Sequence, residues 1–533
     1  MRNWLGALAI CMAVSSTASA GDLKIGVSSE VTTLDPHFFH LTSNTEIHKL
    51  VYSGLVTQDV DLKVIPDLAL SWHTLDDTHW EFKLRQGVMW HDGSPFTADD
   101  VVFTYQRARN VPNAPGPFLQ FLKHVAKTTA VDDHTVVIAL NAVNTTLLPL
   151  ILQVNPLPQA KWSSVGDPTK YTNTSPVVDG PMMLKSFSSQ QITLEKNPDY
   201  FNASNVQVDI LEEQSVTSNN VALEKMSAGQ ADWTGIFNGA LKTSFVNSDP
   251  AHHIINNAPV VPAQIIPNLK DKELSKLAVR QAISAALDRQ QMATSGESGL
   301  EIPASPTGLM PSQTNFAPGG SVPTFAAASA SSADTILQNA GFTKGSDGIY
   351  QDKDGTKLSF KVTVPGDFSD YVADLQVAQQ NLQAAGIGLT LNQTSDDDWR
   401  TARASHNFQL LMSGGFFGTT PWYYYNPLLN STFQTGANAT NWEQYSNPQV
   451  DHLLADYSST SDTNQQAQDI QQIATTFQND LPVIPVLDAV QFADYSTKNW
   501  TGWPTADDPY AIASAYSLAQ GDNGQIIDHL KHT

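Results

Sequence analysis

The chain has 533 residues, of which 41% are hydrophobic and 15% charged, and its formal net charge is −23. This length exceeds what one ordinary hydrophobic core serves, so two or more lobes are expected. Acidic residues outnumber basic ones by 52 to 29, and such a surface repels phosphate backbones, which excludes nucleic acid as a partner. A solvated acidic surface explains the charge, which names no ligand by itself.

The first twenty residues have the layout of a secretory signal peptide. Arg2 precedes an apolar run over residues 4–14, and Ala18-Ser19-Ala20 offers a cleavage site near Ala20. The sole cysteine, Cys11, follows Ile10 where a lipoprotein signal has a small residue, so no lipid anchor is expected. Cleavage leaves a chain without disulfides or Cys-ligated metals. No later segment supplies the roughly 18 uncharged apolar residues of a membrane-spanning helix. We therefore expect an exported, periplasmic protein.

The segments that follow the signal peptide are typical of β structure. Residues 22–25 predict a short strand, Leu34-Asp35-Pro36 breaks it, and a loop rich in aromatic residues and histidine follows at 37–40. Apolar and polar residues alternate over 80–84 and again over 136–140, which is the period of half-buried strands. The first lobe is therefore predicted to contain antiparallel sheet.

From about residue 270 the pattern becomes helical and indicates a second lobe. Residues 277–289 carry an apolar helical face, whereas 312–332 are rich in Pro, Gly, Ala and Ser and predict a surface excursion. Residues 358–391 read as strand, helix and strand, with Gly386 ending the helix. This order predicts a β-α-β unit with a right-handed crossover and parallel strands.

The last third of the chain predicts a return to the first lobe. Two amphipathic helices are expected around 450–457 and 467–477. The stretch 481–485 then contains two prolines, which fit an edge or crossover strand better than a central one. It is therefore the candidate for the return.

The usual anchors of catalysis do not occur. We find no G-x-S-x-G elbow, H-E-x-x-H helix, Walker loop or G-x-G-x-x-G after a strand, so no enzyme and no cofactor is expected, with a secreted glycosidase as the alternative. Residues 396–398 and 352–355 lack the ligand spacing of a calcium loop and fit a helix cap and a hairpin turn. Solvated loops explain the histidines, so no metal site is expected. The histidines in question are His37, His40, His48, His252 and His253.

Several strings of residues resemble, in order and spacing, the family 5 solute-binding proteins of peptide, nickel and oligosaccharide ABC importers. The most specific strings are Pro66-Asp67-Leu68-Ala69 with Ser71-Trp72, residues 82–88, and residues 91–101. We interpret most of these residues as structural, because His91-Asp92-Gly93 predicts a turn and Thr97, Asp99 and Asp100 predict a helix cap. Supporting matches lie at residues 52–56, 195–201, 227–232, 279–282 and 445–448.

The resemblance implies an α/β protein with the two-lobed periplasmic-binding-protein fold of class II, cluster C type. It implies an extra subdomain in lobe I and two crossover hinge strands, with closure of the lobes around a ligand. The expected division is a signal peptide at 1–20, lobe I at 21–265 with an inserted subdomain at about 55–190, lobe II at 266–485, and a return at 486–533. The implied partners are a small oligomeric ligand and the permease subunits of an ABC importer, and a monomer is expected.

The ligand class is inferred from a departure within the family pattern. Peptide-binding members place an aspartate after a Gly-Trp-like strand end in lobe II, but the corresponding stretch here, 413–427, holds no acid and many aromatic residues. A buried ammonium without a carboxylate is costly to desolvate, whereas flat rings suit the apolar faces of sugars. The tail at 502–511 also resembles that of cello- and manno-oligosaccharide binders. We therefore expect an oligosaccharide, with a di- or oligopeptide as the alternative and a nickel or haem carrier third.

The candidate ligand-binding residues come from loops that the resemblance places at the cleft. These are the loop after Leu34-Asp35-Pro36, the loop after Ala231-Asp232, the aromatic stretch of lobe II and the tail. Large aromatic side chains also pack cores wherever they occur, so each ring has a structural alternative. The candidates are Phe38, His40, Phe237, Asn238, Phe417, Trp422, Tyr424 and Trp503.

Overall fold

The computed structural model places most of the chain. It describes residues 21–27, 35–36, 42–59, 63–110, 119–151, 154–166, 171–188, 190–216, 218–416, 418–436, 439–505, 507–515 and 522–533. The expected signal peptide and the loop at 37–40 lie outside these residues. Among the helices in the described ranges, none is long and apolar enough to cross a lipid bilayer.

Both ends of the chain contribute to the main sheet of lobe I, whose strand order is β12-β21-β11-β1-β10-β9-β8. Strand β1 runs parallel to β10 and β11, and the other neighbours are antiparallel. The predicted strand at 22–25 is therefore confirmed. The strands are β1 (Asp22–Val27), β8 (Met182–Phe187), β9 (Gln191–Lys196), β10 (Ile210–Ser215), β11 (Trp233–Thr234), β12 (His253–Ile255) and β21 (Asp494–Ser496).

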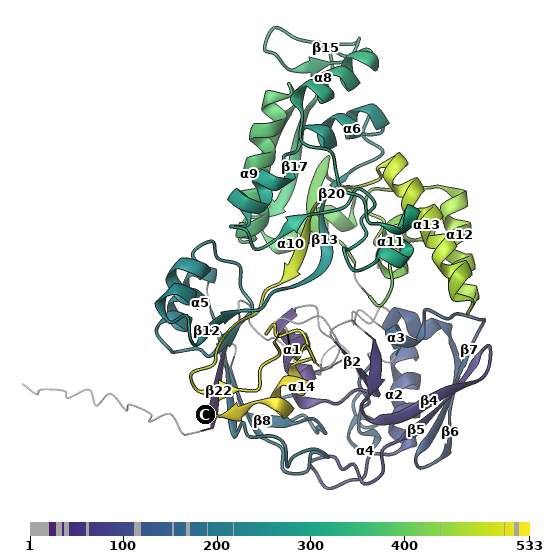
Figure 1. Ribbon diagram of the computed structural model, residues 1–533. Coiled ribbons are helices and arrows are strands. Elements are labelled where there is room, and N and C mark those ends of the chain that lie inside the picture. The colour runs from purple at the N-terminus through teal and green to yellow at the C-terminus, as the bar shows by residue number, and fades with distance from the viewer. Residues whose placement is uncertain are drawn as a thin grey trace, which may run out of the picture.

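A four-stranded antiparallel sheet in the order β4-β5-β7-β6 lies at the lower right of Figure 1, beside the main sheet of lobe I. The strands predicted from alternation at 80–84 and 136–140 are confirmed, because Phe82 lies opposite Val136 and both side chains are fully buried. The strands are β4 (Ala69–Asp76), β5 (His79–Leu84), β6 (Val125–Asp132) and β7 (Thr135–Leu140).

The motif at 91–101 has the structural role predicted for it. The backbone N–H of Ser94 donates to Asp92 Oδ1 at 3.0 Å, and Gly93 has a φ of 85°, a conformation that favours glycine. The Thr97 N–H then donates to Asp100 Oδ2 at 2.9 Å, which satisfies a free donor at the start of helix α2 (Ala98–Asn110).

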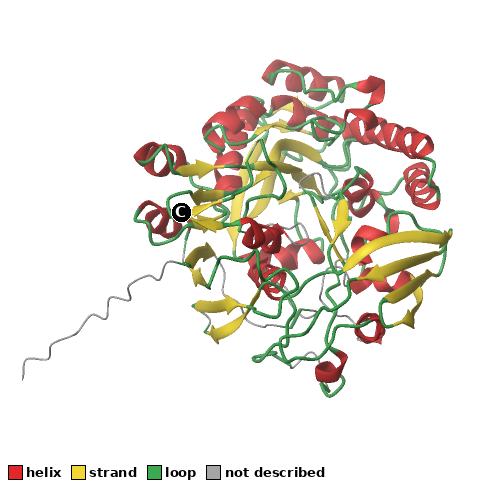
Figure 2. Cartoon of the chain, turned by 60° about the horizontal axis from the view of Figure 1, so that its bottom comes forward, coloured by secondary structure: helices red, strands yellow, loops and turns green. Residues whose placement is uncertain are grey.

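Shorter elements complete lobe I around these two sheets. Figure 2 shows the helices of the molecule packed around and between its strands. The described elements are α1 (Thr42–Val51), β2 (Val56–Gln58), β3 (Val64–Pro66), η1 (Leu119–His124), α3 (Leu148–Ile151), α4 (Gln159–Trp162), α5 (Asn219–Ser227), η3 (Leu241–Phe245), η4 (Val246–Ser248), β22 (Trp500–Thr501), α14 (Asp522–His529) and β23 (Lys531–His532).

Lobe II is built on a sheet with the order β14-β20-β13-β19-β17-β18. The predicted β-α-β unit is confirmed, because β17 and β18 pair in parallel and helix α9 (Ser369–Ala384) joins them. Gly386, with a φ of 73°, follows the end of this helix as predicted. The strands are β13 (Ala258–Pro267), β14 (Ile302–Pro303), β17 (Ser359–Pro365), β18 (Gly388–Thr394), β19 (Leu410–Gly414) and β20 (Ile484–Gln491).

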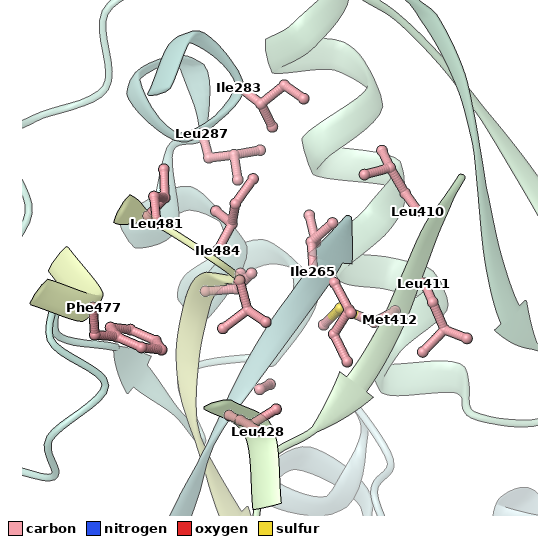
Figure 3. Close-up of a cluster of buried hydrophobic side chains, with 14 of the residues drawn as sticks. Ile265, Ile283, Leu287, Leu410, Leu411, Met412, Leu428, Phe477, Leu481 and Ile484 are labelled. Atoms are coloured by element: carbon pink, nitrogen blue, oxygen red, sulfur yellow. The ribbon is translucent and has the colours of Figure 1, made fainter. Parts of the chain in front are cut away.

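Helices cover the lobe II sheet and include the three predicted ones, now α6 (Leu277–Ala286), α12 (Pro448–Ser459) and α13 (Thr463–Asp480). Figure 3 shows apolar side chains of α6 and α13 gathered with those of the sheet, among them Ile283, Phe477, Ile265 and Met412. Burial of these side chains stabilises the lobe. The other elements are α7 (Arg289–Gln291), η5 (Met292–Gly296), η6 (Thr314–Phe316), η7 (Pro318–Gly320), α8 (Ala330–Asn339), β15 (Thr343–Lys344), β16 (Tyr350–Gln351), α10 (Asp396–Ala404), α11 (Trp422–Leu429) and η8 (Ser431–Phe433).

Two chain segments cross between the lobes, β12 to β13 and β20 to β21 (Figure 1). At the crossing, Asn256 N–H donates to the Ala493 carbonyl at 2.8 Å, and Ala493 N–H donates to Asn257 Oδ1 at 3.1 Å. The stretch 481–485 leads into β20, the returning strand, and Pro485 is tolerated there because it lies beyond the part of β20 that pairs with β14. The boundaries at 265 and 485 stay predictions; both fall within or next to these crossing strands.

The lobes also touch away from the crossing strands, at an interlobe contact formed by Thr145, Thr146, Tyr423 and Ser458. Thr145 N–H donates to the Ser458 carbonyl at 2.8 Å, and Tyr423 OH donates to the Thr146 carbonyl at 2.6 Å. In Figure 1 this contact lies at the right, where α12 approaches α3. The structure thus holds the two lobes together at this contact as well as at the crossing strands.

Candidate ligand-binding site

A cavity of about 610 Å³ lies between the lobes. Lobe I contributes residues 218–220 at the start of α5 and residues 235–239 after β11, and Phe492 comes from the crossing segment. Lobe II contributes residues 366–371, from the end of β17 into the first turn of α9. Because both lobes form its walls, a ligand in this cavity contacts both and favours their closure.

The lobe I wall presents amides and an aromatic pair. Asn238 Nδ2 donates to Asn220 Oδ1 at 2.8 Å, and Asn238 Oδ1 accepts from Ala240 N–H at 2.9 Å, which fixes the orientation of the amide. The rings of Phe237 and Phe492 lie 5.6 Å apart between centroids. This wall therefore offers hydrogen bonds and apolar surface without charge.

The lobe II wall supplies the charge. Asp367 is exposed and Asp370 is half-buried, and no Lys, Arg or His is among the described residues that line the cavity. Burial raises the pKa of Asp370 to about 6, against the opposing effect of the hydrogen bond from the Tyr371 N–H. Phe368 and Tyr371 add an edge-to-face aromatic pair at 5.9 Å. Across the cavity, Asn219 Nδ2 approaches Ser369 Oγ at 3.5 Å.

Further acidic side chains lie behind this wall. Together with Asp370, the side chains of Glu297, Glu301 and Asp374 are named here the carboxyl cluster. Glu297 and Asp374 are 1% and 0% exposed, and burial together with their mutual repulsion raises the pKa of Glu297. Burial likewise raises the pKa of Glu301 and of Asp374 well above the ordinary range. Glu301 Oε1 accepts from the Val490 N–H of β20 at 3.1 Å, so the cluster adjoins a crossing strand.

The structure places five of the eight predicted ligand-binding residues. Phe237 and Asn238 line the interlobe cavity. Trp422 and Tyr424 are buried in lobe II, where Trp422 Nε1 donates to the Leu454 carbonyl at 3.0 Å and Tyr424 OH donates to Gln264 Oε1 at 2.7 Å.

Trp503 is buried in lobe I and stacks on Tyr495 with 4.6 Å between ring centroids. None of these three buried residues is among those that line the cavity, and their contact with ligand stays a prediction. Phe38, His40 and Phe417 lie outside the described residues.

Sequence reasoning did not select Asp367, Phe368, Asp370, Tyr371 and Phe492. A signal for the first four exists, because they follow the first strand of the predicted β-α-β unit. Ligands in α/β sheets bind beyond the carboxyl ends of strands, near the start of the next helix. The stretch 413–427 holds no acid, but the cavity receives its carboxylates from residues 366–371. The missing acid at 413–427 therefore no longer argues against a cationic ligand.

Two α/β lobes, two crossing strands and a cavity between the lobes define a protein that closes around a small solute. The sequence matches the bacterial extracellular solute-binding proteins, family 5 middle, over residues 63–436. The chain belongs to this family. It is a solute-binding protein of the class that serves ABC importers, as the motifs at 66–101 predicted.

The named relatives span nearly the whole chain. The periplasmic oligopeptide-binding protein OppA of Salmonella typhimurium is 24% identical, with 93% of this chain and 94% of the relative covered. The oligopeptide-binding protein AppA of Bacillus subtilis is 28% identical, with 87% and 85% covered. These relatives are solute-binding proteins and not enzymes, which agrees with the expected class.

Solved structures show the same fold. A periplasmic oligopeptide-binding protein of an ABC transporter from Thermotoga maritima superposes with a TM-score of 0.87 at 21% identity, covering 96% of this chain and 99% of that chain. A mannohexaose-bound structure of that protein superposes with a TM-score of 0.83 at 21% identity, covering 97% and 99%. The expected two-lobed α/β fold is therefore confirmed.

Proposed function

We propose that the protein captures a peptide in the interlobe cavity and delivers it to the permease of an ABC importer. The observation that carries this proposal is the pair of carboxylates, Asp367 and Asp370, on a cavity wall that has no described basic residue. A peptide amino terminus is a cation, and its pairing with a carboxylate is a strong, charge-assisted hydrogen bond. An oligosaccharide has no charge to match this wall.

The remaining lining residues suit the other parts of a peptide. The amides of Asn219, Asn220 and Asn238 offer donors and acceptors for peptide groups. The rings of Phe237 and Phe492 offer apolar surface for side chains. The names of the relatives from Salmonella typhimurium and Bacillus subtilis, both oligopeptide-binding, support the same class of ligand.

We place the mature protein in the periplasm as part of this proposal. The layout of residues 1–20 favours export, and relatives from Salmonella typhimurium and Escherichia coli are named as periplasmic. In this proposal the protein captures the peptide in the periplasm before the permease transports it. The protein therefore releases its peptide unaltered. Incubation with a peptide and recovery of that same peptide checks this point.

Replacing the Asp370 carboxylate tests the proposed function. Asp370→Asn keeps the shape of the side chain and removes its charge, so the affinity for trialanine is expected to fall about ten- to hundredfold.

The affinity of wild type for trialanine is also expected to fall as the pH drops below about 6, because protonation of Asp370 removes the partner of the ammonium. Isothermal titration of ligand-free protein, refolded from denaturant, measures both effects.

The controls separate the ligand classes. N-acetyl-trialanine lacks the ammonium, so it is expected to bind weakly to wild type and to lose nothing further in Asp370→Asn. Asp354→Asn, at an exposed position in lobe II, is the matched control and is expected to bind as wild type does. Binding of cello- or manno-oligosaccharides, with no response to any peptide, contradicts the proposal and returns the ligand to the sugar class.

A further inference from the structure

Each wall of the interlobe cavity carries a pair of aromatic rings. On the lobe I side, Phe237 follows β11, and its ring lies 5.6 Å from the ring of Phe492. On the lobe II side, Phe368 precedes α9 and Tyr371 lies in its first turn, and their rings lie 5.9 Å apart. All four residues line the cavity. Both walls therefore present aromatic surface beside their polar groups.

Most of these rings are not covered by the protein itself. Phe492, Phe368 and Tyr371 are half-buried, whereas Phe237 is 8% exposed. The ring of Phe368 also packs against that of Trp399 at 6.2 Å, which holds it in place. Removal of such half-exposed rings from water by an apolar group is favourable. The cavity thus offers a prepared apolar surface that a ligand group can cover.

The two lobes touch beside these rings. Asn219 Nδ2 of lobe I lies 3.5 Å from Ser369 Oγ of lobe II, and a Cβ atom at Gly239 would lie 2.9 Å from Ser298 Oγ of lobe II. Ser369 and Gly239 are one and two residues away, respectively, from a ring of the cavity lining. Because the walls approach each other so closely here, a large side chain held at the rings contacts both lobes.

We propose that these aromatic rings form a subsite for a large apolar side chain at the first residue of the bound peptide. This inference rests on the proposed function and names the class of peptide. Asp370, the proposed partner of the peptide's ammonium group, lies between Phe368 and Tyr371 in the sequence. The side chain nearest to that ammonium group is therefore the one that reaches the rings. An aromatic or large aliphatic side chain gains from this contact, whereas a polar side chain loses its water there.

The position of Phe492 couples this contact to closure of the lobes. Phe492 lies between β20 and β21, in a segment that crosses from lobe II to lobe I. A side chain that covers Phe492 and the rings of lobe II contacts the crossing segment and both walls. A ligand shifts the equilibrium between open and closed forms by its extra affinity for the closed form. A large apolar first residue therefore favours closure more than alanine does.

The test compares tripeptides that differ in the kind or the position of one side chain. Phe-Ala-Ala, Gln-Ala-Ala, Ala-Ala-Phe and trialanine are titrated into ligand-free wild type by calorimetry at pH 7.5. Phe-Ala-Ala is expected to bind at least about tenfold more tightly than trialanine. Gln-Ala-Ala has a long but polar side chain and is expected to bind within about threefold of trialanine. Ala-Ala-Phe is expected to bind more weakly than Phe-Ala-Ala.

Substitutions assign this preference to the rings. Phe237→Ala and Phe368→Ala, one on each wall, are expected to weaken binding of Phe-Ala-Ala at least about fivefold more than binding of trialanine. Phe187→Ala is the matched control, because Phe187 is a 37% exposed phenylalanine of lobe I that is not among the described residues lining the cavity. It is expected to keep the full preference. A thermal melt of each variant confirms that it folds, and the wild-type series tests the proposal without any variant.

The outcomes separate this subsite from peptide capture itself. If Phe-Ala-Ala binds no better than trialanine, or if Gln-Ala-Ala gains as much as Phe-Ala-Ala, the subsite proposal is overturned while peptide capture stands. The same holds if Ala-Ala-Phe binds as tightly as Phe-Ala-Ala, or if the preference persists unchanged in the folded variants of both walls. If none of these tripeptides binds wild type, the proposed function itself fails.

Discussion

Oxidation of a Thr145→Cys/Ser458→Cys double variant after ligand loading is expected to slow ligand release at least about tenfold, and a reducing agent is expected to restore the wild-type rate. The Thr145 N–H and the Ser458 carbonyl oxygen are 2.8 Å apart, which brings the two residues within the Cα spacing of about 4.4–6.8 Å that disulfides span. A bond at this place holds the lobes together, and a ligand enclosed by both lobes leaves only when they separate. Stopped-flow displacement with excess unlabelled peptide measures the rate.

Two features make the result of this experiment unambiguous. The sequence has one cysteine, Cys11, inside the expected signal peptide, so the introduced pair has no native competitor once that segment is removed. Each single-cysteine variant is the control and is expected to release ligand at the wild-type rate under both conditions. Fast release from protein whose cross-link is confirmed by mass spectrometry would show that the cavity empties without lobe separation.

Raising the pH from 5 to 8.5 is expected to lower the melting temperature of the ligand-free protein by at least about 5 °C. Burial raises the pKa of Glu213 and of Asp494 to about 8 and that of Asp488 to about 7. A raised pKa means that the folded state keeps a proton that the unfolded chain has already lost. Stability from these groups is therefore complete below about pH 4 and is lost as the pH rises through 7 to 8. Differential scanning calorimetry at constant ionic strength measures the change.

One substitution assigns part of this pH dependence. Asp494 Oδ2 accepts from the Ile236 N–H at 3.1 Å, and Asp494→Asn keeps an acceptor oxygen there while removing the titration. Its melting temperature is expected to vary less between pH 5 and 8.5 than that of wild type, because a tenfold change in proton affinity on folding corresponds to about 1.4 kcal/mol. Asp354→Asn, at the exposed site, is expected to follow wild type. A wild-type melting temperature that rises over this range contradicts the prediction.

The local structure of this protein is predictable because periodicity and turn chemistry are local. Alternation at 80–84 and 136–140 identified paired strands, and the strand, helix and strand pattern at 358–391 identified a parallel pair. Gly386 marked the helix end because its left-handed backbone costs other residues more. The motifs at 66–101 identified the family by resemblance and are now supported by the family match.

The candidate site was predictable only in part. Phe237 and Asn238 were selected by resemblance and line the cavity, but a carboxylate partner for the ligand was sought only at 413–427. Asp370 reaches the cavity because β17 ends at the interlobe face and α9 starts there. The position of Asp370 depends on which strands are neighbours in the sheet. Local patterns along the chain do not reveal that order. Trp422 shows the same limit, because the sequence does not distinguish an aromatic residue that packs in a core from one that contacts a ligand.

By itself, the sequence determined the α/β elements, the expected export signal, and the family of a solute-binding protein. Those properties depend on short segments of the sequence, in which spacing and residue type are enough to predict them. Only the tertiary structure decided that residues 366–371 and 235–239 share one cavity, and that acids distant in sequence, such as Glu297 and Asp374, meet inside lobe II. The tertiary structure also decided the charge of these acids. The formal net charge of −23 counts every carboxyl group as ionised, whereas burial keeps protons on the carboxyl groups that the fold removes from water.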